Sequence, residues 1–292
     1  MNHMEGQICL VTGANAGIGK QTALELAQMG ATVVLVARDP QRGEAARAAI
    51  VTASGNPRVD LLQADFSSPA LIRTMTEAFK ARYDRLDVLV NNAGVYLTQR
   101  QETADGLEMT FAVNHLGYFM TTLLLWDSLL AARSARVINL SSDAHRQAKL
   151  NFDDLQNKHK YAGFRAYGQS KLANVLFTYE LDRRRDDAPI TINAVHPGFV
   201  ASNFGRNNRG VVGLFMTRLV PLFAKTVVEG AATSVYLASS PEVAGVSGQY
   251  FTNCRAVKSA PQSYDRAAAE RLWTISEKLT GVRLPDLALP GQ

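Results

Sequence analysis

A tyrosine and a lysine four residues apart, Tyr167 and Lys171, are the side chains in this sequence whose types and spacing could do chemistry. The residues after them follow a helical pattern, and on a helix residues i and i+4 lie on one face, so the ammonium would lie near the phenol. A tyrosine loses its proton near pH 10, and a neighbouring positive charge lowers that pKa. Tyr167 would then be usable as an acid or base near neutral pH. The same spacing is common in solvated or half-buried pairs, so the pair indicates a site only where its surroundings fit.

A glycine-rich turn lies between the first apolar run and the first helical pattern. Residues 7–12 are typical of a buried parallel strand, and residues 13–19 carry glycines at the spacing G-x-x-x-G-x-G. A strand, a glycine turn and a helix start in this order place a phosphate against free backbone N–H groups. The spacing differs from the commoner dinucleotide pattern G-x-G-x-x-G, and a glycine turn without a ligand is the alternative.

Arg38 and Asp39 follow the second apolar run, residues 32–37, and bear on which dinucleotide would bind. An acidic residue about 20 positions past the glycines binds the ribose 2′-hydroxyl of NAD, whereas an arginine nearby accommodates the 2′-phosphate of NADP. Asp39 precedes Pro40 and can simply open the next turn, and Arg42 adds a second cation. The sequence therefore predicts NADP, with NAD as the alternative.

The remaining apolar runs predict a parallel sheet whose strand ends gather polar and small residues. Further strands are expected at 59–63, 86–90, 137–140, 191–195 and 249–252, with helices between them. Strand–helix repeats with short links favour right-handed crossovers and a doubly wound sheet, in which ligands bind at the carboxyl ends of the strands. The glycine turn, Arg38, Asp65 and residues 91–94 all follow strands, so we expect them to share one rim and to form a nucleotide site.

Two further polar residues are candidates for the site. Asn114 lies within an apolar stretch, residues 104–130, that reads as one long helix. A buried amide must be hydrogen-bonded, so a structural bond and a role in the site are both open. Ser142 follows the strand at 137–140, although serines are also common turn residues.

The composition is that of a soluble globular protein, with 292 residues, 47% hydrophobic and 20% charged. We found no internal repeat or linker, so one domain over residues 1–292 is expected. The net charge is +5, but the basic triplet at 183–185 lies where a helix should end and suits the helix dipole, so no nucleic acid is expected.

The chain has two cysteines and no Cys/His spacing typical of a zinc site, so neither a disulfide framework nor a metal is expected. This low use of cysteine suits the reducing environment of the cytoplasm. The first strand begins by Ile8, and no apolar run reaches ~18 residues, so neither a signal peptide nor a spanning helix is expected.

Residues 201–228 depart from the regular pattern, being first polar and basic and then apolar from 211 to 223. One reading is a helix packed on the core. The other is a lid over a hydrophobic cleft, which favours a bulky lipophilic ligand over a sugar. The cations that flank the apolar part would also suit an anionic membrane surface.

Together these motifs resemble the short-chain dehydrogenase/reductase family over essentially the whole chain. The residues that carry the resemblance occur in the family's order: Thr12-Gly13-x-x-x-Gly17-Ile18-Gly19, Asp65, Asn91-Asn92-Ala93-Gly94, Asn114, Ser142, Tyr167-x-x-x-Lys171 and Pro197-Gly198. Segments at 17–20, 113–117, 170–174 and 269–273 further look like the retinol-dehydrogenase-like branch. The resemblance implies a single Rossmann-type doubly wound α/β domain, with a seven-stranded parallel sheet flanked by helices.

The resemblance also implies a mechanism. Tyr167 would exchange a proton with the substrate oxygen, and Ser142 would hydrogen-bond the same oxygen. Lys171 would lower the pKa of Tyr167 and hold the nicotinamide ribose, while Asn114 would position a water that links Lys171 to solvent. Hydride would pass directly between the nicotinamide and the carbonyl carbon. The implied cofactor contacts are Gly13, Asn15, Ala16, Gly17, Ile18, Gly19, Arg38, Asp65, Phe66, Asn92, Ala93, Gly94, Tyr167, Lys171, Pro197, Gly198 and Val200.

The chain departs from the family in three places. Animal members of the branch usually carry an N-terminal hydrophobic anchor, which this sequence lacks. Ser202 stands where the family often has threonine, and Ala16 stands where many NADP-dependent members have a basic residue. The last departure keeps NAD open as the alternative cofactor.

The predicted function is that of an NADP-dependent oxidoreductase that interconverts a lipophilic aldehyde or ketone and its alcohol. The alternatives are an NAD-dependent alcohol- or steroid-type dehydrogenase, and a non-catalytic nucleotide-sensing protein on the same fold. Because the helices expected at 104–130 and 161–185 are apolar enough to pair between subunits, a homodimer or homotetramer is expected. The predicted location is cytoplasmic, with peripheral membrane contact as an option.

Overall fold

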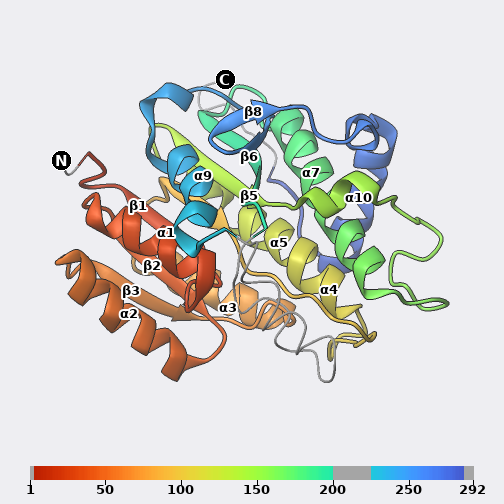
Figure 1. The fold of residues 1–292 in the computed structure, drawn as a ribbon, viewed down its shortest axis with the longest axis horizontal. Coiled ribbons are helices and arrows are strands. Elements are labelled where there is room, and N and C mark those ends of the chain that lie inside the picture. Colours follow the sequence, from red (N-terminus) through yellow and green to blue (C-terminus); the bar gives the residue numbers. More distant parts are fainter. Residues whose placement is uncertain (1–2, 200–224, 286–292) are drawn as a thin grey trace.

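One twisted sheet runs through the molecule, and its strands follow the order β3-β2-β1-β4-β5-β6-β7-β8 (Figure 1). The computed structural model describes residues 3–199 and 225–285. The strands are β1 (Ile8–Thr12), β2 (Thr32–Ala37), β3 (Val59–Gln63), β4 (Val88–Asn91), β5 (Ala135–Leu140), β6 (Ile190–His196), β7 (Tyr250–Thr252) and β8 (Arg255–Val257). β1 pairs in parallel with both β2 and β4, so the strand order reverses at β1. This reversal is the point at which doubly wound sheets bind ligands.

Helices cover both faces of the sheet (Figure 1). The longer ones are α1 (Gly17–Gln28), α2 (Pro40–Ser54), α3 (Pro69–Lys80), α5 (Gly117–Leu124), α7 (Gly163–Arg184), α9 (Val227–Ser239) and α10 (Arg266–Thr280). Shorter ones are α4 (Met109–Phe111), α6 (Trp126–Leu130), the π-helical turn η1 (Ala112–Leu116), and the 3₁₀ turns η2 (Asp143–Gln147), η4 (Pro241–Val243) and η5 (Pro261–Tyr264). α1 packs against α2 and α9 on one side, and α3, α5 and α7 lie on the other.

The seven expected strands are all present and parallel, which confirms the doubly wound α/β fold. An eighth strand, β8, was not expected; it pairs antiparallel with β7 through a tight hairpin. Both residues of its turn, Asn253 and Cys254, have positive φ, 50° and 57°. Tight hairpins need positive φ at their two central residues, and glycine usually supplies it. Because the turn lacks a glycine, residues 250–257 carry no hairpin signal in the sequence.

The expectation of one long helix over 104–130 was wrong. The helical stretch begins only at Met109, where the buried carboxylate of Glu108 accepts the N–H groups of Thr110 (2.8 Å) and Phe111 (2.7 Å). It then passes through η1 before α5 and α6. Apolar composition alone could not reveal these breaks, because η1 is buried throughout and α5 is buried except at its last residue.

Helix α10 lies across α7 and the α4–η1 segment. Leu272 joins the apolar cluster formed with Phe111, Leu172 and Leu176, and Trp273 lies 5.1 Å from Phe119 and 6.0 Å from Phe177, measured between ring centroids. The apolar faces from which subunit pairing was expected are therefore covered within the chain. Homo-oligomer formation stays a prediction, without that support.

None of the helices in residues 3–199 and 225–285 combines the length and the apolar character needed to cross a membrane. The segment 201–228, expected to form a substrate lid, lies outside the described residues up to 224.

Candidate active site

The turn between β1 and α1 is built so tightly that only glycine fits at two of its positions. Gly13 has φ +65°, and a Cβ there would lie 2.9 Å from the Cα of Ala93. A Cβ at Gly19 would lie 2.6 Å from the carbonyl oxygen of Gly13 and closer still to the Asn92 amide. Ala16, at the N-cap of α1, makes no side-chain cap, in contrast to Asp39 on α2 and Ser68 on α3. The first N–H groups of α1 thus have no side-chain acceptor, as a bound phosphate requires.

The end of β4 is tied to this turn by Asn92 and Thr12. The backbone N–H groups of Asn92 and Ala93 donate to the hydroxyl of Thr12, at 2.8 and 3.0 Å. The side-chain amide of Asn92 donates to the carbonyl of Thr12 at 2.7 Å. Thr12 was not proposed as a site residue, because a threonine that ends a strand gives no signal of its own. The glycine turn and residues 92–94 do share one rim, as expected.

Arg38 and Asp65 lie at the neighbouring strand ends, where an adenosine ribose would meet the protein. The Arg38 side chain is 68% exposed, and its Nε lies 3.9 Å from the Asp65 carboxylate. Asp39 points elsewhere: its carboxylate accepts the backbone N–H of Arg42 (2.9 Å) and caps α2. The turn-opening role expected for Asp39 is therefore confirmed. Phe66 is buried, and its ring packs against Gly117, so the side chain proposed as a cofactor contact belongs to the core.

Tyr167 and Lys171 lie on one face of α7, as their spacing predicted. The Lys171 ammonium donates to the carbonyl of Leu140 (2.9 Å) and lies over the rings of Tyr167 and Tyr118, at 5.8 and 5.5 Å from their centroids. A Cβ on Gly94 would lie 3.8 Å from the same nitrogen. Lys171 thus reaches from α7 to the ends of both β4 and β5.

The expected lowering of the Tyr167 pKa by Lys171 is not found. Burial raises the pKa of Tyr167 to about 12, and the hydrogen bond from Ser142 opposes that rise. Burial also lowers the pKa of Lys171 to about 7. Since Lys171 is only about half protonated near pH 7, its charge stabilises the phenolate of Tyr167 weakly.

Asn114 sits in the π-helical turn η1 and is fully buried. Its Oδ1 accepts the backbone N–H of Val95 (2.7 Å), and its Nδ2 donates to the Val95 carbonyl (3.0 Å) and to the Ser170 hydroxyl (3.0 Å). π-Helical turns occur frequently at functional sites. The structural bond left open by the sequence is therefore real, and it joins η1 to α7 and to the strand end that carries Gly94.

Ser142 follows β5 and caps η2, its Oγ accepting the backbone N–H of Ala144 (3.3 Å). Tyr96, another residue that was not proposed, packs edge-on against Tyr167 with ring centroids 5.7 Å apart. Pro197 and Gly198 follow β6 at the same rim, where Gly198 has φ +88° and lies against Lys225. Val200 lies outside the described residues. The structure thus brings the four proposed catalytic residues together, and the shape and chemistry of the adjoining turn fit a dinucleotide.

The chain belongs to the short-chain dehydrogenase family, whose sequence profile matches residues 7–210. It is an NAD(P)-dependent enzyme that acts on CH–OH donors. Among its relatives are mouse retinol dehydrogenase 12 (42% identical over 95% of this chain and 87% of that protein) and human retinol dehydrogenase 13 (43%, 97% and 87%). The resemblance to the retinol-dehydrogenase-like branch is confirmed.

Solved structures are similar over most of the chain. An uncharacterised protein of Mycobacterium paratuberculosis matches with a TM-score of 0.79 at 31% identity, over 97% of this chain and 96% of that one. A short-chain dehydrogenase of Burkholderia cenocepacia in complex with NADP matches with a TM-score of 0.68 at 26% identity, over 86% and 97%.

Proposed function

We propose that the protein uses NADP to interconvert a lipophilic aldehyde or ketone and its alcohol. The observation that carries the proposal is the convergence of Ser142, Tyr167, Lys171 and Asn114 beside the glycine turn. The names of the relatives, retinol dehydrogenases at 42–43% identity, support a retinoid-like substrate. The nicotinamide, when bound, exchanges a hydride with the substrate carbon.

The proton chemistry belongs to this chain's own residues. Tyr167 holds its proton at neutral pH, because burial raises its pKa to about 12, and so is ready as a general acid for a carbonyl oxygen. Ser142, hydrogen-bonded to Tyr167, donates to the same substrate oxygen as charge develops on it. Asn114 fixes η1 against α7, and Lys171 holds the nicotinamide ribose and supplies the route by which Tyr167 is reprotonated.

The preference for NADP rests on the unequal situations of Arg38 and Asp39. The Arg38 guanidinium is largely exposed at the end of β2, whereas the Asp39 carboxylate is occupied by the cap of α2. An exposed guanidinium suits a 2′-phosphate. The NADP bound in the Burkholderia structure supports the same choice.

A panel of carbonyl substrates tests the proposal. We expect NADPH-dependent reduction of all-trans-retinal, long aliphatic aldehydes or steroid ketones to exceed reduction of small polar carbonyls. A preference for small polar carbonyls would contradict the proposed substrate class but not the proposed reaction. Faster turnover with NADH than with NADPH would make NAD the cofactor. The absence of turnover of every member of the panel with either cofactor would place the substrate outside the lipophilic class.

Replacing Arg38 with alanine tests the cofactor preference directly. Because hydrogen bonds to charged groups are worth about 1.5–3 kcal/mol, we expect the ratio of kcat/KM for NADPH to that for NADH to fall about 10- to 100-fold. Arg47→Ala is the matched control, since Arg47 lies on α2 and is already paired with Glu44 (2.6 Å). An unchanged ratio in Arg38→Ala would remove the argument for NADP.

We also propose a cytoplasmic location for the protein. Fractionation of cells that express it tests this, and recovery in the membrane pellet at high salt would contradict it.

A further inference from the structure

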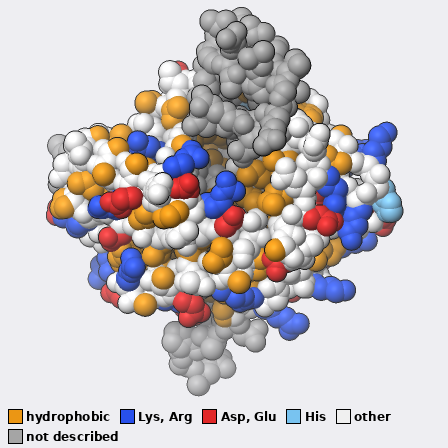
Figure 2. All heavy atoms as spheres, turned by 90° about the horizontal axis from the view of Figure 1, so that it is seen from below, with side chains coloured by type: hydrophobic (Ala, Val, Ile, Leu, Met, Phe, Trp, Pro, Cys, Tyr) orange, Lys and Arg blue, Asp and Glu red, His pale blue; other side chains and the backbone are white. Residues whose placement is uncertain are grey.

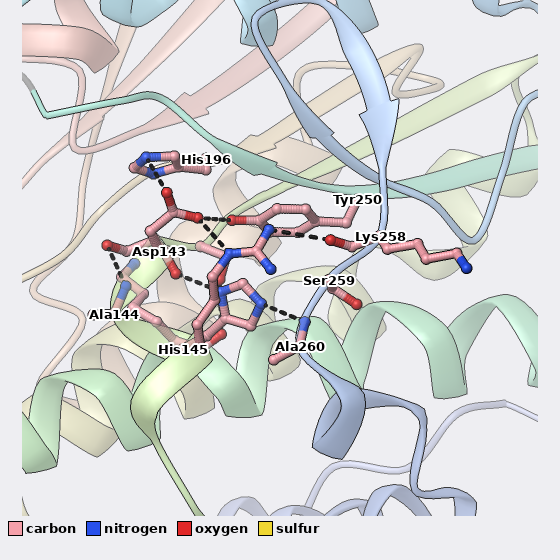
Figure 3. A network of polar contacts seen from close by, with 12 residues as sticks. Asp143, Ala144, His145, His196, Tyr250, Lys258, Ser259 and Ala260 are labelled. Carbon is pink, nitrogen blue, oxygen red and sulfur yellow. Dashed lines mark hydrogen bonds and ion pairs between the residues drawn. The ribbon is translucent and has the colours of Figure 1, made fainter.

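His145 is a fully buried histidine three residues after Ser142, and both of its ring nitrogens are engaged (Figure 3). Nδ1 lies 2.7 Å from the carbonyl oxygen of Ser142, and Nε2 lies 3.0 Å from the backbone nitrogen of Ala260. The ring also packs against Tyr250 of β7, with centroids 4.8 Å apart. The histidine therefore connects the turn after β5 to a segment more than 100 residues downstream.

The two partners determine which nitrogen of His145 carries the proton. A carbonyl oxygen can only accept, so Nδ1 must donate its hydrogen to Ser142. The backbone N–H of Ala260 can only donate, so Nε2 must present its lone pair. The ring is thus neutral and held in the Nδ1–H form. Its surroundings agree, because burial lowers the pKa of His145.

We propose that His145 is a positioning residue for Ser142, acting through the Nδ1–H bond to the Ser142 carbonyl. That carbonyl accepts a second bond from the His145 backbone N–H (3.0 Å), and the two together fix the peptide plane of Ser142. Fixing this plane fixes the ψ angle of Ser142 and so the direction of its Cα–Cβ bond, from which the hydroxyl reaches Tyr167. The backbone N–H of Ala260 holds His145 in the tautomer with its proton on Nδ1, and this proton is the one donated to the Ser142 carbonyl. The inference rests on the role proposed above for Ser142.

The other side-chain contacts of η2 are made to residues other than Ser142. Gln262 donates to the carbonyls of His145 (3.1 Å), Arg146 (3.1 Å) and Ala148 (2.9 Å). Asp143 accepts from Arg146 (3.1 Å) and Tyr250 (3.2 Å) and lies 3.3 Å from His196 (Figure 3). Of these side chains, the His145 ring is the one that bonds Ser142 itself.

Two substitutions separate positioning from simple anchoring. In His145→Asn the amide nitrogen takes the place of Nδ1 and keeps the donor to Ser142, whereas in His145→Gln the terminal amide takes the place of Nε2 and keeps a partner for Ala260. We expect His145→Gln to lower kcat and kcat/KM together by about 10- to 100-fold, the range for a misplaced catalytic group. His145→Asn should stay within about threefold of the wild type, although both variants lose thermal stability.

The assay uses all-trans-retinal and NADPH, with turnover counted per NADPH-binding site so that unfolded protein is excluded. Gln262→Ala is the matched control, because it loosens the same turn without touching Ser142; it should lower Tm and leave kcat within about threefold. If the Gln variant does not fold, His145→Ala, which lacks both bonds, replaces it against His145→Asn. Equal kcat losses in the two histidine variants, or an equal loss in Gln262→Ala, would overturn the proposal.

Ser142→Ala distinguishes a failure of this inference from a failure of the proposed function. If Ser142→Ala keeps full turnover, the role of Ser142 is wrong and that of His145 falls with it. If Ser142→Ala loses turnover while His145→Gln does not, only the inference about His145 is wrong.

Discussion

Burial of Lys171 changes what its charge contributes to the site. The residue is 3% exposed, and its nitrogen donates to the carbonyl of Leu140 (2.9 Å). Desolvation lowers its pKa to about 7, because a charged form is penalised in a poorly solvated place. Near neutral pH, Lys171 is thus poised to gain or lose a proton, which suits a residue in a proton route better than a fixed counter-charge.

The stability of the protein should depend on pH through Lys171. Between about pH 7 and 10 the unfolded chain keeps a proton on this lysine that the folded chain has lost. The unfolded state then binds more protons, so the free energy of unfolding rises with pH, by at most about 1.4 kcal/mol per unit. Lys171→Met should lack this rise in denaturant titrations, whereas the exposed Lys80→Met should keep it. Parallel pH profiles for wild type and Lys171→Met would show that Lys171 stays charged in the fold.

Tyr167→Phe should remove the proton donor and leave the rest of the site in place. We expect kcat to fall about 10²- to 10⁴-fold, the usual contribution of a general acid, with NADPH affinity little changed. Tyr161→Phe provides the control, since that hydroxyl donates to the Leu97 carbonyl (3.0 Å) and is not the one that Ser142 hydrogen-bonds. Turnover within about tenfold of wild type in Tyr167→Phe would refute the assignment.

The side chains of the site could be predicted better than their protonation. The sequence placed Ser142 at a strand end, because ligands of a doubly wound sheet bind at the carboxyl ends of its strands. It placed Tyr167 and Lys171 on one helix face, because the helical repeat brings residues four apart to the same face. The pKa values depend on burial, which needs the packed structure. For the same reason His145 had no signal in the sequence: its partners Ser142 and Ala260 meet only in the fold.

Among the elements, α10 has the broadest influence on the site. It covers α7, which carries Tyr167 and Lys171, and its Ser276 lies 2.9 Å from Nε2 of the buried His115, next to Asn114 in η1. Trp273 anchors the helix: its ring packs against both Phe119 and Phe177, and Arg184 lies over its face at 4.5 Å.

Trp273→Ala should therefore lower the free energy of unfolding by about 3–5 kcal/mol, the range for removal of a buried aromatic side chain. Thr274→Ala, an exposed position on the same helix, should change it by no more than about 0.5 kcal/mol. Chemical denaturation followed by fluorescence and circular dichroism measures both. A loss below about 1 kcal/mol in Trp273→Ala would mean that α10 contributes little to the fold.

Helices and strands were predicted correctly where their sequence pattern is local, and were missed where they depend on residues distant in sequence. The strands of the sheet were found from apolar runs bounded by turns. The start of α4 depends instead on a buried carboxylate, Glu108, and β8 on two non-glycine residues with positive φ. Each is held by a contact distant in sequence, since the backbone N–H of Glu108 donates to Gln156 (2.7 Å) and that of Cys254 to Thr233 (3.2 Å).

At the scale of the whole molecule, the face that Figure 2 presents carries cationic, anionic and apolar side chains interspersed. The net charge of the whole chain is +5. A surface of mixed charge attracts a polyanion less than a one-sign patch would; that no nucleic acid is bound stays a prediction.

Binding of NADPH should stabilise the fold as a whole. A ligand at 100 times its Kd that binds only the folded state adds about 2.7 kcal/mol, and we expect a larger rise in Tm with NADPH than with NADH at equal concentration. Calorimetry measures the shift. Gly19→Ala should abolish it, because the added methyl would overlap Gly13 and Asn92. An equal shift in Gly19→Ala would place the dinucleotide elsewhere.

The cap that Asp39 places on α2 has a consequence for coenzyme engineering. Charge reversal at the end of β2 is a natural route to altered nicotinamide preference, and in this protein the two adjacent positions are not equivalent. Changing Asp39 would remove the N-cap of α2 and lower the free energy of unfolding by about 0.5–2 kcal/mol. A change in cofactor preference could then not be separated from the loss of stability. Arg38 is exposed and serves no helix. Redesign can therefore be confined to Arg38 and leave the scaffold intact.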